Sequence, residues 1–246
     1  MVGAPITTDD QQDLGSAPPS SAAAAIERAL LVNMRRTEIL LVRHGQQDFT
    51  IARSRPGKTD PPLTVLGHEQ ARSLALHLAG DAVTHVYCSD LRRAQETANH
   101  VSDALRAPLS VVPELREVSL FRDLPADRPL AEILGQAQLA AVSAEFLRSR
   151  RFDAFPSTES SAELRKRAVT AVSALAERHG NERIVVVAHG GFINAFIAEV
   201  LGIEQDMFFF PAHASVTRVL FNDRWALYSA NETSHLVGNG RSLVSF

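Results

Sequence analysis

The sequence predicts an α/β fold, a three-layer α/β/α sandwich in which helices cover both faces of a sheet. Strongly apolar runs at residues 39–42 and 184–188 are typical of parallel strands that are buried on both faces. Segments with helical periodicity alternate with these runs and with weaker strand-like segments. This alternation is the pattern of a layered α/β domain.

Composition indicates a globular core and excludes several classes of protein. The chain has 246 residues, of which 45% are hydrophobic and 22% charged, and its formal net charge is -3. Without an overall basic field, we expect no binding to nucleic acid or to a membrane surface. Cys88 is the one cysteine, so no intramolecular disulfide can form. No run of 18 apolar residues occurs and the first ten residues lack Lys and Arg, so we expect a cytoplasmic protein without a membrane span or signal peptide.

The beginning of the chain differs from the remainder. Residues 1–21 are rich in Ala, Ser, Pro and Thr without an apolar period, and residues 22–34 could form a short helix or be disordered. We therefore expect residues 1–35 to be a disordered or partly helical tail and residues 36–246 to be the domain. Within the domain, residues 121–155 interrupt the alternation with two prolines, an Ala-rich stretch and several arginines. We interpret them as an inserted lid or substrate-specificity region.

Periodicity and capping residues predict the elements of the domain in order. After the strand at 39–42, an apolar face repeats from 63 to 79, with Thr64 as the expected N-cap. A short strand is expected at 83–88, and Ser89 or Asp90 is the expected cap of a helix that runs to about residue 107. The other expected elements are an extended segment at 108–112, a helix at 160–179, the strand at 184–188 with a helix after it, and strands near 216–221 and 226–229.

The candidate catalytic residues lie where the two most apolar strands end. One ends in Arg43-His44-Gly45 and the other in His189-Gly190-Gly191. Parallel strands deliver their carboxyl ends to one edge of a sheet, so both histidines should face one crevice. The guanidinium of Arg43 can bind phosphate oxygens, and Gly45 lacks the Cβ that would obstruct a ligand near the backbone. Arg93, in the first turn of the next helix but one, can reach the same crevice.

Ordered motifs along the chain resemble those of a known family. They are Leu41-Val42-Arg43-His44-Gly45, Pro62-Leu63-Thr64 with Gly67 and Gln70-Ala71, the stretch 89–98, Leu115-Arg116-Glu117, Thr158-Glu159-Ser160 and Val187-Ala188-His189-Gly190-Gly191. Together they resemble the histidine phosphatase superfamily, in its phosphoglycerate mutase-like branch. The resemblance implies a phosphoglycerate mutase-like fold, with an antiparallel edge strand beside a mainly parallel sheet.

The resemblance also implies a function for each matching residue. His44 is the expected nucleophile that forms a phosphohistidine, while Arg43, Arg93 and His189 form the phosphate pocket, with His189 also catalytic. Glu117 is the expected proton donor to the leaving alcohol. The implied activity is hydrolysis of phosphate monoesters without a metal or cofactor, on a small phosphorylated metabolite. Alternative proton donors are Asp90, Glu96 and Asp123.

The chain departs from the family pattern near the expected substrate. Gln46, Gln47 and Thr50 replace the usual residues after the first motif, and we expect Gln46 and Thr50 to be candidate substrate contacts. His213 stands where relatives often have a small polar residue at the pocket rim, so it is either a substrate contact or a surface-loop residue. These differences leave the substrate open.

Two other functions remain alternatives, and a third fails on the spacing of its residues. A cysteine phosphatase requires an Arg six positions after its Cys, but Ala94 follows Cys88 at that spacing, so we expect Cys88 to be a buried strand residue. A phosphoglycerate mutase and a catalytically weak phosphate-binding pseudoenzyme both stay open. A homodimer is a further candidate, with residues 208–210 as a contact if their aromatic rings lie outside the core.

Overall fold

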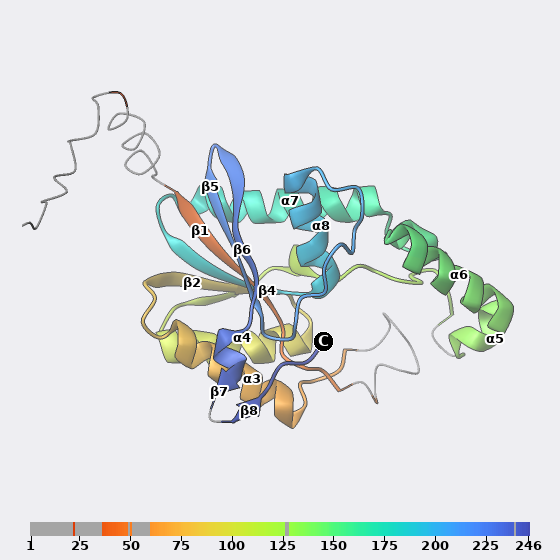
Figure 1. Cartoon of the computed structure of the whole chain (residues 1–246), viewed down its shortest axis with the longest axis horizontal. Coiled ribbons are helices and arrows are strands. Elements are labelled where there is room, and N and C mark those ends of the chain that lie inside the picture. Colours follow the sequence, from red (N-terminus) through yellow and green to blue (C-terminus); the bar gives the residue numbers. More distant parts are fainter. Residues whose placement is uncertain (1–21, 23–35, 49, 51–59, 126–127, 239) are drawn as a thin grey trace, which may run out of the picture. The chain divides into compact units, whose positions relative to one another are not determined.

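Six strands form one sheet in the order β3-β2-β4-β1-β5-β6 (Figure 1). The computed structural model describes residues 22, 36–48, 50, 60–125, 128–238 and 240–246, so the predicted tail lies almost wholly outside the described residues. Strands β1 to β4 pair in parallel, and β5 runs antiparallel to both β1 and β6. The predicted fold class, mainly parallel with antiparallel pairing at one edge, is confirmed. The strands are β1 (Thr37–Arg43), β2 (Val83–Cys88), β3 (Leu109–Val111), β4 (Arg183–Ala188), β5 (Val216–Asn222) and β6 (Arg224–Glu232).

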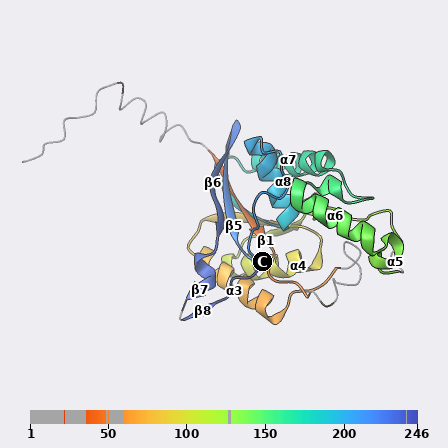
Figure 2. The ribbon, with the colours of Figure 1, turned by 45° about the vertical axis from the view of Figure 1, so that its right-hand side comes forward.

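Helices cover both faces of this sheet (Figure 2). Alternate residues of β1 point to opposite faces, so Ile39 and Leu41 pack with α7 (Ser161–Arg178) and α8 (Gly190–Leu201). Leu40 and Val42 pack with α3 (Val65–Leu78) and α4 (Arg92–Leu105). All four side chains are completely buried. The central strand is therefore apolar throughout because each face of the sheet has its own core.

The cap of α3 follows the sequence prediction, but the cap of α4 does not. The Thr64 side chain accepts from the backbone N–H of Gly67, as predicted. The N-cap of α4 is Leu91, which has no side-chain cap bond, so the prediction of Ser89 or Asp90 was wrong. The carboxylate of Asp60 accepts from the N–H of Arg92 at 2.8 Å. A residue distant in sequence thus performs the capping that a local residue was expected to perform.

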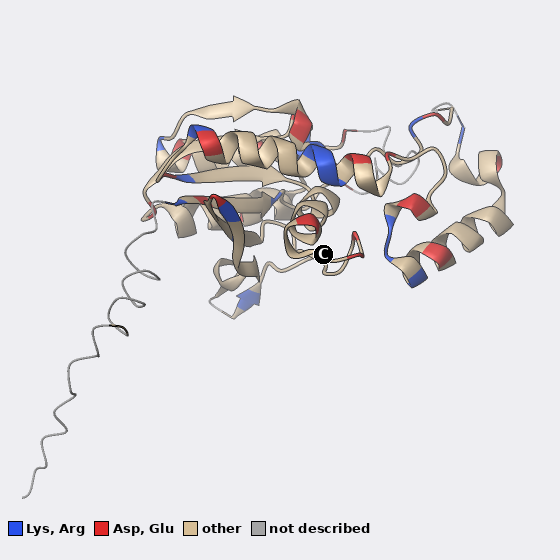
Figure 3. Ribbon diagram, turned by 90° about the horizontal axis from the view of Figure 1, so that it is seen from above, with Lys and Arg blue, Asp and Glu red and all other residues tan. Residues whose placement is uncertain are grey.

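The region 121–155 contains two helices, α5 (Leu130–Leu134) and α6 (Gln136–Ser149), which extend away from the sheet (Figure 3). Neither helix has a buried residue. Phe152 attaches the region to the domain, because it packs in a small core with Leu164 of α7 and Ala195 of α8. The lid interpretation stays a prediction.

Three single-turn helices and a short hairpin complete the described fold. The single-turn helices are η1 (Pro113–Leu115), η2 (Phe152–Ala154) and η3 (Ser234–Leu236), and β7 (Val237–Gly238) pairs with β8 (Arg241–Ser242). Among the described helices, none combines the length and the apolar character needed to cross a membrane. Cys88 is fully buried in β2, as expected, and burial raises the pKa of its thiol to about 12.

Candidate active site

The ends of β1 and β4 bring His44 and His189 together. Arg43 pairs with Ala188 in the register of these parallel strands, and the N–H of His44 donates to the carbonyl of Ala188 at 3.1 Å. The next residue on each strand is therefore a histidine, and the two ring centroids lie 5.1 Å apart. The two histidines thus lie side by side at this edge of the sheet, and that both act in one site stays a prediction.

Two hydrogen bonds define which nitrogen of His44 is available. Nδ1 lies 2.7 Å from the carbonyl oxygen of Gly45, which can only accept, so Nδ1 carries the proton. Nε2 then accepts from Nε of Arg93 at 3.1 Å. Burial, with help from Arg93 and His189, holds the pKa of His44 well below its usual value of 6.5. The imidazole is neutral and presents a lone pair on Nε2.

Two hydrogen bonds hold the guanidinium of Arg43, and its Nε–H donor has no partner among the described residues. Its Nη1 donates to the carbonyl of Pro211 at 2.5 Å and its Nη2 lies 2.9 Å from Nε2 of His213. Its Nε is buried and has no hydrogen-bond partner among the described residues. Burial lowers the pKa of Arg43 to about 10, which still leaves the guanidinium charged at neutral pH. A buried charged donor without a partner is suited to an anionic oxygen.

His189 is the N-cap residue of α8 and is completely buried. Neither of its ring nitrogens has a partner within the described part of the chain. Burial, together with the charges of Arg93 and Arg43, holds the pKa of His189 well below 6.5. A neutral imidazole with a free N–H at a helix amino end can donate to a phosphate oxygen.

Glu117 reaches this site because α8 binds its carboxylate. Oε2 accepts from the N–H of Gly191 at 3.1 Å, and Oε1 accepts from the N–H groups of Phe192 and Val118, each at 3.0 Å. The charge of Glu117 raises the pKa values of Arg43 and Arg93 against the effect of burial. Glu117 therefore lies within electrostatic reach of both arginines.

The alternative proton donors are engaged elsewhere or exposed. Asp90 accepts from Arg116 at 2.6 Å, and Glu96 accepts from the N–H of Leu63 at 2.7 Å and pairs with Arg92. The side chain of Asp123 is 71% exposed. None of these three carboxylates is among the described lining of the cavity, whereas Glu117 is. This placement favours Glu117.

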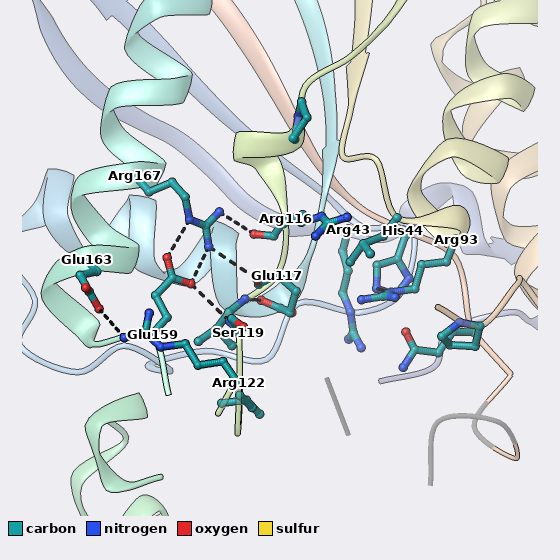
Figure 4. A pocket seen from close by; sticks show the side chains of 16 residues that line it. Arg43, His44, Arg93, Arg116, Glu117, Ser119, Arg122, Glu159, Glu163 and Arg167 are labelled. Carbon is teal, nitrogen blue, oxygen red and sulfur yellow. Dashed lines mark hydrogen bonds and ion pairs between the residues drawn. The ribbon is translucent and has the colours of Figure 1, made fainter. Parts of the chain in front are cut away.

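A cavity of about 720 Å³ opens in front of His44 (Figure 4). Arg43, His44 and Arg93 lie at one end in this view, and Arg167 and Glu159 lie at the other. Its described lining includes Arg43, His44, Gln47, Arg93, Arg116, Glu117, Val118, Leu120, Arg122, Glu159 and Arg167. The chamber is far larger than a phosphate group, so it can also hold an organic group.

Arg167 supports the segment that carries Glu117. Sequence reasoning did not identify this role of Arg167. Its guanidinium pairs with Glu159 at 2.7 Å and donates to the carbonyls of Glu114 at 2.7 Å and Arg116 at 2.8 Å (Figure 4). Glu159 was part of a recognised motif, and a buried carboxylate requires a cationic partner. The need of Glu159 for a cationic partner could have pointed to an arginine, but the sequence did not identify which arginine it is.

Four residues that were expected to contact the phosphate or the substrate make other contacts in the structure. A Cβ on Gly45 would lie 2.5 Å from the carbonyl oxygen of Gly67, so the lack of a side chain at Gly45 serves packing against the start of α3. The side chain of Gln46 accepts from Thr64 at 2.9 Å, and it is Gln47 that lines the cavity. Thr50 is exposed and donates to Asp48, while residues 49 and 51–59 lie outside the described residues. His213 is fully buried behind Arg43 and is not a rim residue.

Comparisons with known proteins identify the family of this chain. Residues 39–233 match the model of the histidine phosphatase superfamily, branch 1, and the chain belongs to that family. A Yersinia pestis protein named probable phosphoglycerate mutase GpmB is 28% identical over 214 residues, which cover 81% of this chain and 94% of the relative.

Two solved structures are also similar. YhfR of Bacillus stearothermophilus has a TM-score of 0.71 at 24% identity, covering 81% of this chain and 98% of that one, which shows the shared fold. A mycobacterial glucosyl-3-phosphoglycerate phosphatase has a TM-score of 0.67 at 25% identity, covering 80% of this chain and 99% of that one. The matched proteins thus carry names of both a mutase and a phosphatase.

Proposed function

We propose that this chain hydrolyses phosphate monoesters through a phosphohistidine intermediate on His44. The observation that carries the proposal is the neutral imidazole of His44, whose Nδ1 proton is fixed by Gly45 and whose Nε2 lone pair faces the cavity arginines. A neutral nitrogen can attack phosphorus, and a covalent intermediate divides one difficult displacement into two easier ones.

In the first step, a bond forms between Nε2 of His44 and phosphorus while the bond from phosphorus to the ester oxygen breaks. Arg93 turns its Nε–H from Nε2 to a phosphate oxygen, and Arg43 and His189 donate to the other oxygens. Glu117 is the group that passes a proton to the leaving oxygen, which departs as an alcohol. Fixed donors around phosphorus stabilise the charge that spreads over these oxygens in the transition state.

In the second step, water attacks phosphorus and the bond from phosphorus to Nε2 breaks. Glu117 is then a carboxylate and takes the proton of the attacking water, which restores its starting state. Inorganic phosphate is released and His44 regains its Nε2 lone pair. The charge of the phosphoryl group is met by two guanidinium groups, so the proposed reaction requires no metal ion.

The proposed substrate is a small phosphorylated metabolite. The cavity volume of about 720 Å³ supports a metabolite-sized organic group in front of the phosphate. A phosphoglycerate mutase activity is the second candidate, and the name of the Yersinia pestis relative supports it. A mutase would return the phosphoryl group from His44 to a reoriented substrate rather than to water.

The test compares the wild-type protein with His44→Ala in the presence of EDTA. Phosphate release is measured on 4-nitrophenyl phosphate, phosphoserine, 3-phosphoglycerate and glucosyl-3-phosphoglycerate, and mutase flux is measured in parallel on 3-phosphoglycerate. We expect release by the wild type and a loss of at least about 10³-fold in His44→Ala. Isomerisation without release would support the mutase, and turnover retained by His44→Ala would overturn the nucleophile assignment.

A further inference from the structure

A chain of hydrogen bonds connects Arg43 to the last residues of the sequence. His213 lies between them: its Nε2 is 2.9 Å from Nη2 of Arg43 and its Nδ1 is 3.0 Å from Oγ of Ser245. The backbone N–H of His213 also donates to the carbonyl of Ser245 at 2.8 Å. The chain end marked C in Figure 1 belongs to this segment, residues 243–246.

The direction of each hydrogen bond in this chain is determined. A guanidinium can only donate, so Nε2 of His213 accepts from Arg43. Burial and the charge of Arg43 lower the pKa of His213 to about 3, so the ring is neutral and its single proton is on Nδ1. Nδ1–H therefore donates to Oγ of Ser245.

Gln70 of α3 fixes Ser245 from the other side. Its Oε1 accepts from the backbone N–H of Gln46 at 2.8 Å, which defines the orientation of the amide. Its Nε2 then donates to Oγ of Ser245 at 2.9 Å and to the carbonyl of Leu243 at 2.7 Å. Ser245 Oγ thus accepts from two donors, Nε2 of Gln70 and Nδ1 of His213.

We propose that Ser245 and His213 are positioning residues of the phosphate pocket. Ser245 holds the orientation of the His213 ring by accepting from Nδ1–H, so that Nε2 of His213 accepts from Arg43, and this contact orients the guanidinium for the substrate phosphate. With Nη1 held by Pro211 and Nη2 by His213, Nε of Arg43 is left as a buried donor without a partner among the described residues. The inference rests on the proposed function, because it takes Arg43 as a ligand of phosphate.

Loss of the Ser245 hydroxyl removes the side-chain acceptor that holds the His213 ring. The ring is then held less firmly, and the hydrogen bond from Nη2 of Arg43 to Nε2 of His213 weakens. The guanidinium would turn from its position in the pocket. The defect should appear as weaker binding of phosphate groups, since Arg43 contacts the substrate before and during the reaction.

The first experiment compares Ser245→Ala with Ser242→Ala. Ser242 is a matched control because it is exposed and lies directly before this segment. Its Oγ accepts from the backbone N–H of Val244 rather than from His213. We measure KM and kcat for 4-nitrophenyl phosphate and the Kd of inorganic phosphate. Ser245→Ala should raise KM and Kd roughly 3- to 10-fold, with a smaller change in kcat, and Ser242→Ala should leave both unchanged. Equal behaviour of the two variants would overturn the proposal.

The second experiment compares His213→Gln with His213→Leu. Gln supplies an Oε1 that can accept from Arg43, whereas Leu has a similar size and no acceptor. We expect Leu to weaken phosphate binding roughly 10- to 100-fold and Gln to recover most of the loss. A packing role for His213 would instead make Leu at least as good as Gln, which would overturn the proposal. The Kd needs no turnover, so this result stays readable even if the wild type hydrolyses none of the esters.

Discussion

Arg93 donates from Nε to Nε2 of His44 at 3.1 Å, so the lone pair of the proposed nucleophile is occupied by a guanidinium before substrate binds. An incoming phosphate oxygen offers Arg93 a stronger, charged acceptor and frees the lone pair. Substrate binding and exposure of the nucleophile are thereby coupled through one side chain.

Arg93→Lys tests this coupling, because Lys keeps the charge and loses the planar Nε donor. We expect kcat/KM for 4-nitrophenyl phosphate to fall about 10²-fold. Arg92→Lys is the matched control: the Arg92 side chain is 60% exposed and pairs with Glu96. Steady-state kinetics on both variants provides the measurement, and equal activity of the two would contradict the role of Arg93.

Glu117→Gln should have an effect that depends on the leaving group. An alkyl oxygen requires a proton as it leaves, whereas 4-nitrophenolate is stable without one. We expect kcat to fall about 10²-fold or more on an alkyl phosphate such as phosphoserine and less than about tenfold on 4-nitrophenyl phosphate. Glu114→Gln, on the exposed face of η1, is the control. A uniform loss on both substrates would assign Glu117 a structural role instead.

Acid should destabilise the fold through its buried histidines. Burial lowers the pKa of His213 to about 3 and that of His235 to about 4. The unfolded chain binds these protons near pH 6.5 and the folded chain does not, so the free energy of unfolding is largest above pH 6.5 and falls as the pH drops toward 4 and then 3.

Urea titrations at pH 7, 6, 5 and 4 measure this dependence. Each such histidine contributes a slope of at most about 1.4 kcal/mol per pH unit. His235→Gln should therefore give a shallower pH dependence than the wild type, whatever its stability at pH 7. An unchanged slope would show that His235 titrates alike in the folded and unfolded chains.

Gly67→Ala should destabilise the protein where Gly80→Ala does not. A Cβ on Gly67 would lie 2.2 Å from the carbonyl oxygen of Gln46, whereas a Cβ on Gly80 would meet nothing within 4 Å. Overpacking of this kind costs about 1–3 kcal/mol, and an alanine in open space is neutral or slightly stabilising. The midpoints of thermal unfolding of the two variants can be compared directly. Equal midpoints would mean that β1 and α3 separate at little cost.

Much of the fold could be predicted because it depends on local signals. The apolar runs at β1 and β4 predicted buried parallel strands, and Thr64 was identified from its position before an amphipathic segment. The repeated His-Gly at the ends of two such strands was enough to expect His44 and His189 in one site. These inferences needed only the order of residues and the geometry of parallel sheets.

The incorrect predictions share a physical cause. In each case the contacts of the residue are with a segment that is distant in the sequence. The cap of α4 comes from Asp60, and the role of Gly45 is set by the backbone of Gly67. His213 was expected at a rim, but the segment after β8 covers it through Ser245. A sequence pattern shows what a residue can do, while its partner depends on how distant segments pack.

The first turn of α8 positions two residues that have different roles in the proposed reaction. His189 begins this turn, and the N–H groups of Gly191 and Phe192 hold the carboxylate of Glu117. Fraying of this one turn would release the proton donor and displace a phosphate ligand together. Catalytic activity should therefore require this turn to be intact, and loss of its helical hydrogen bonds should abolish activity.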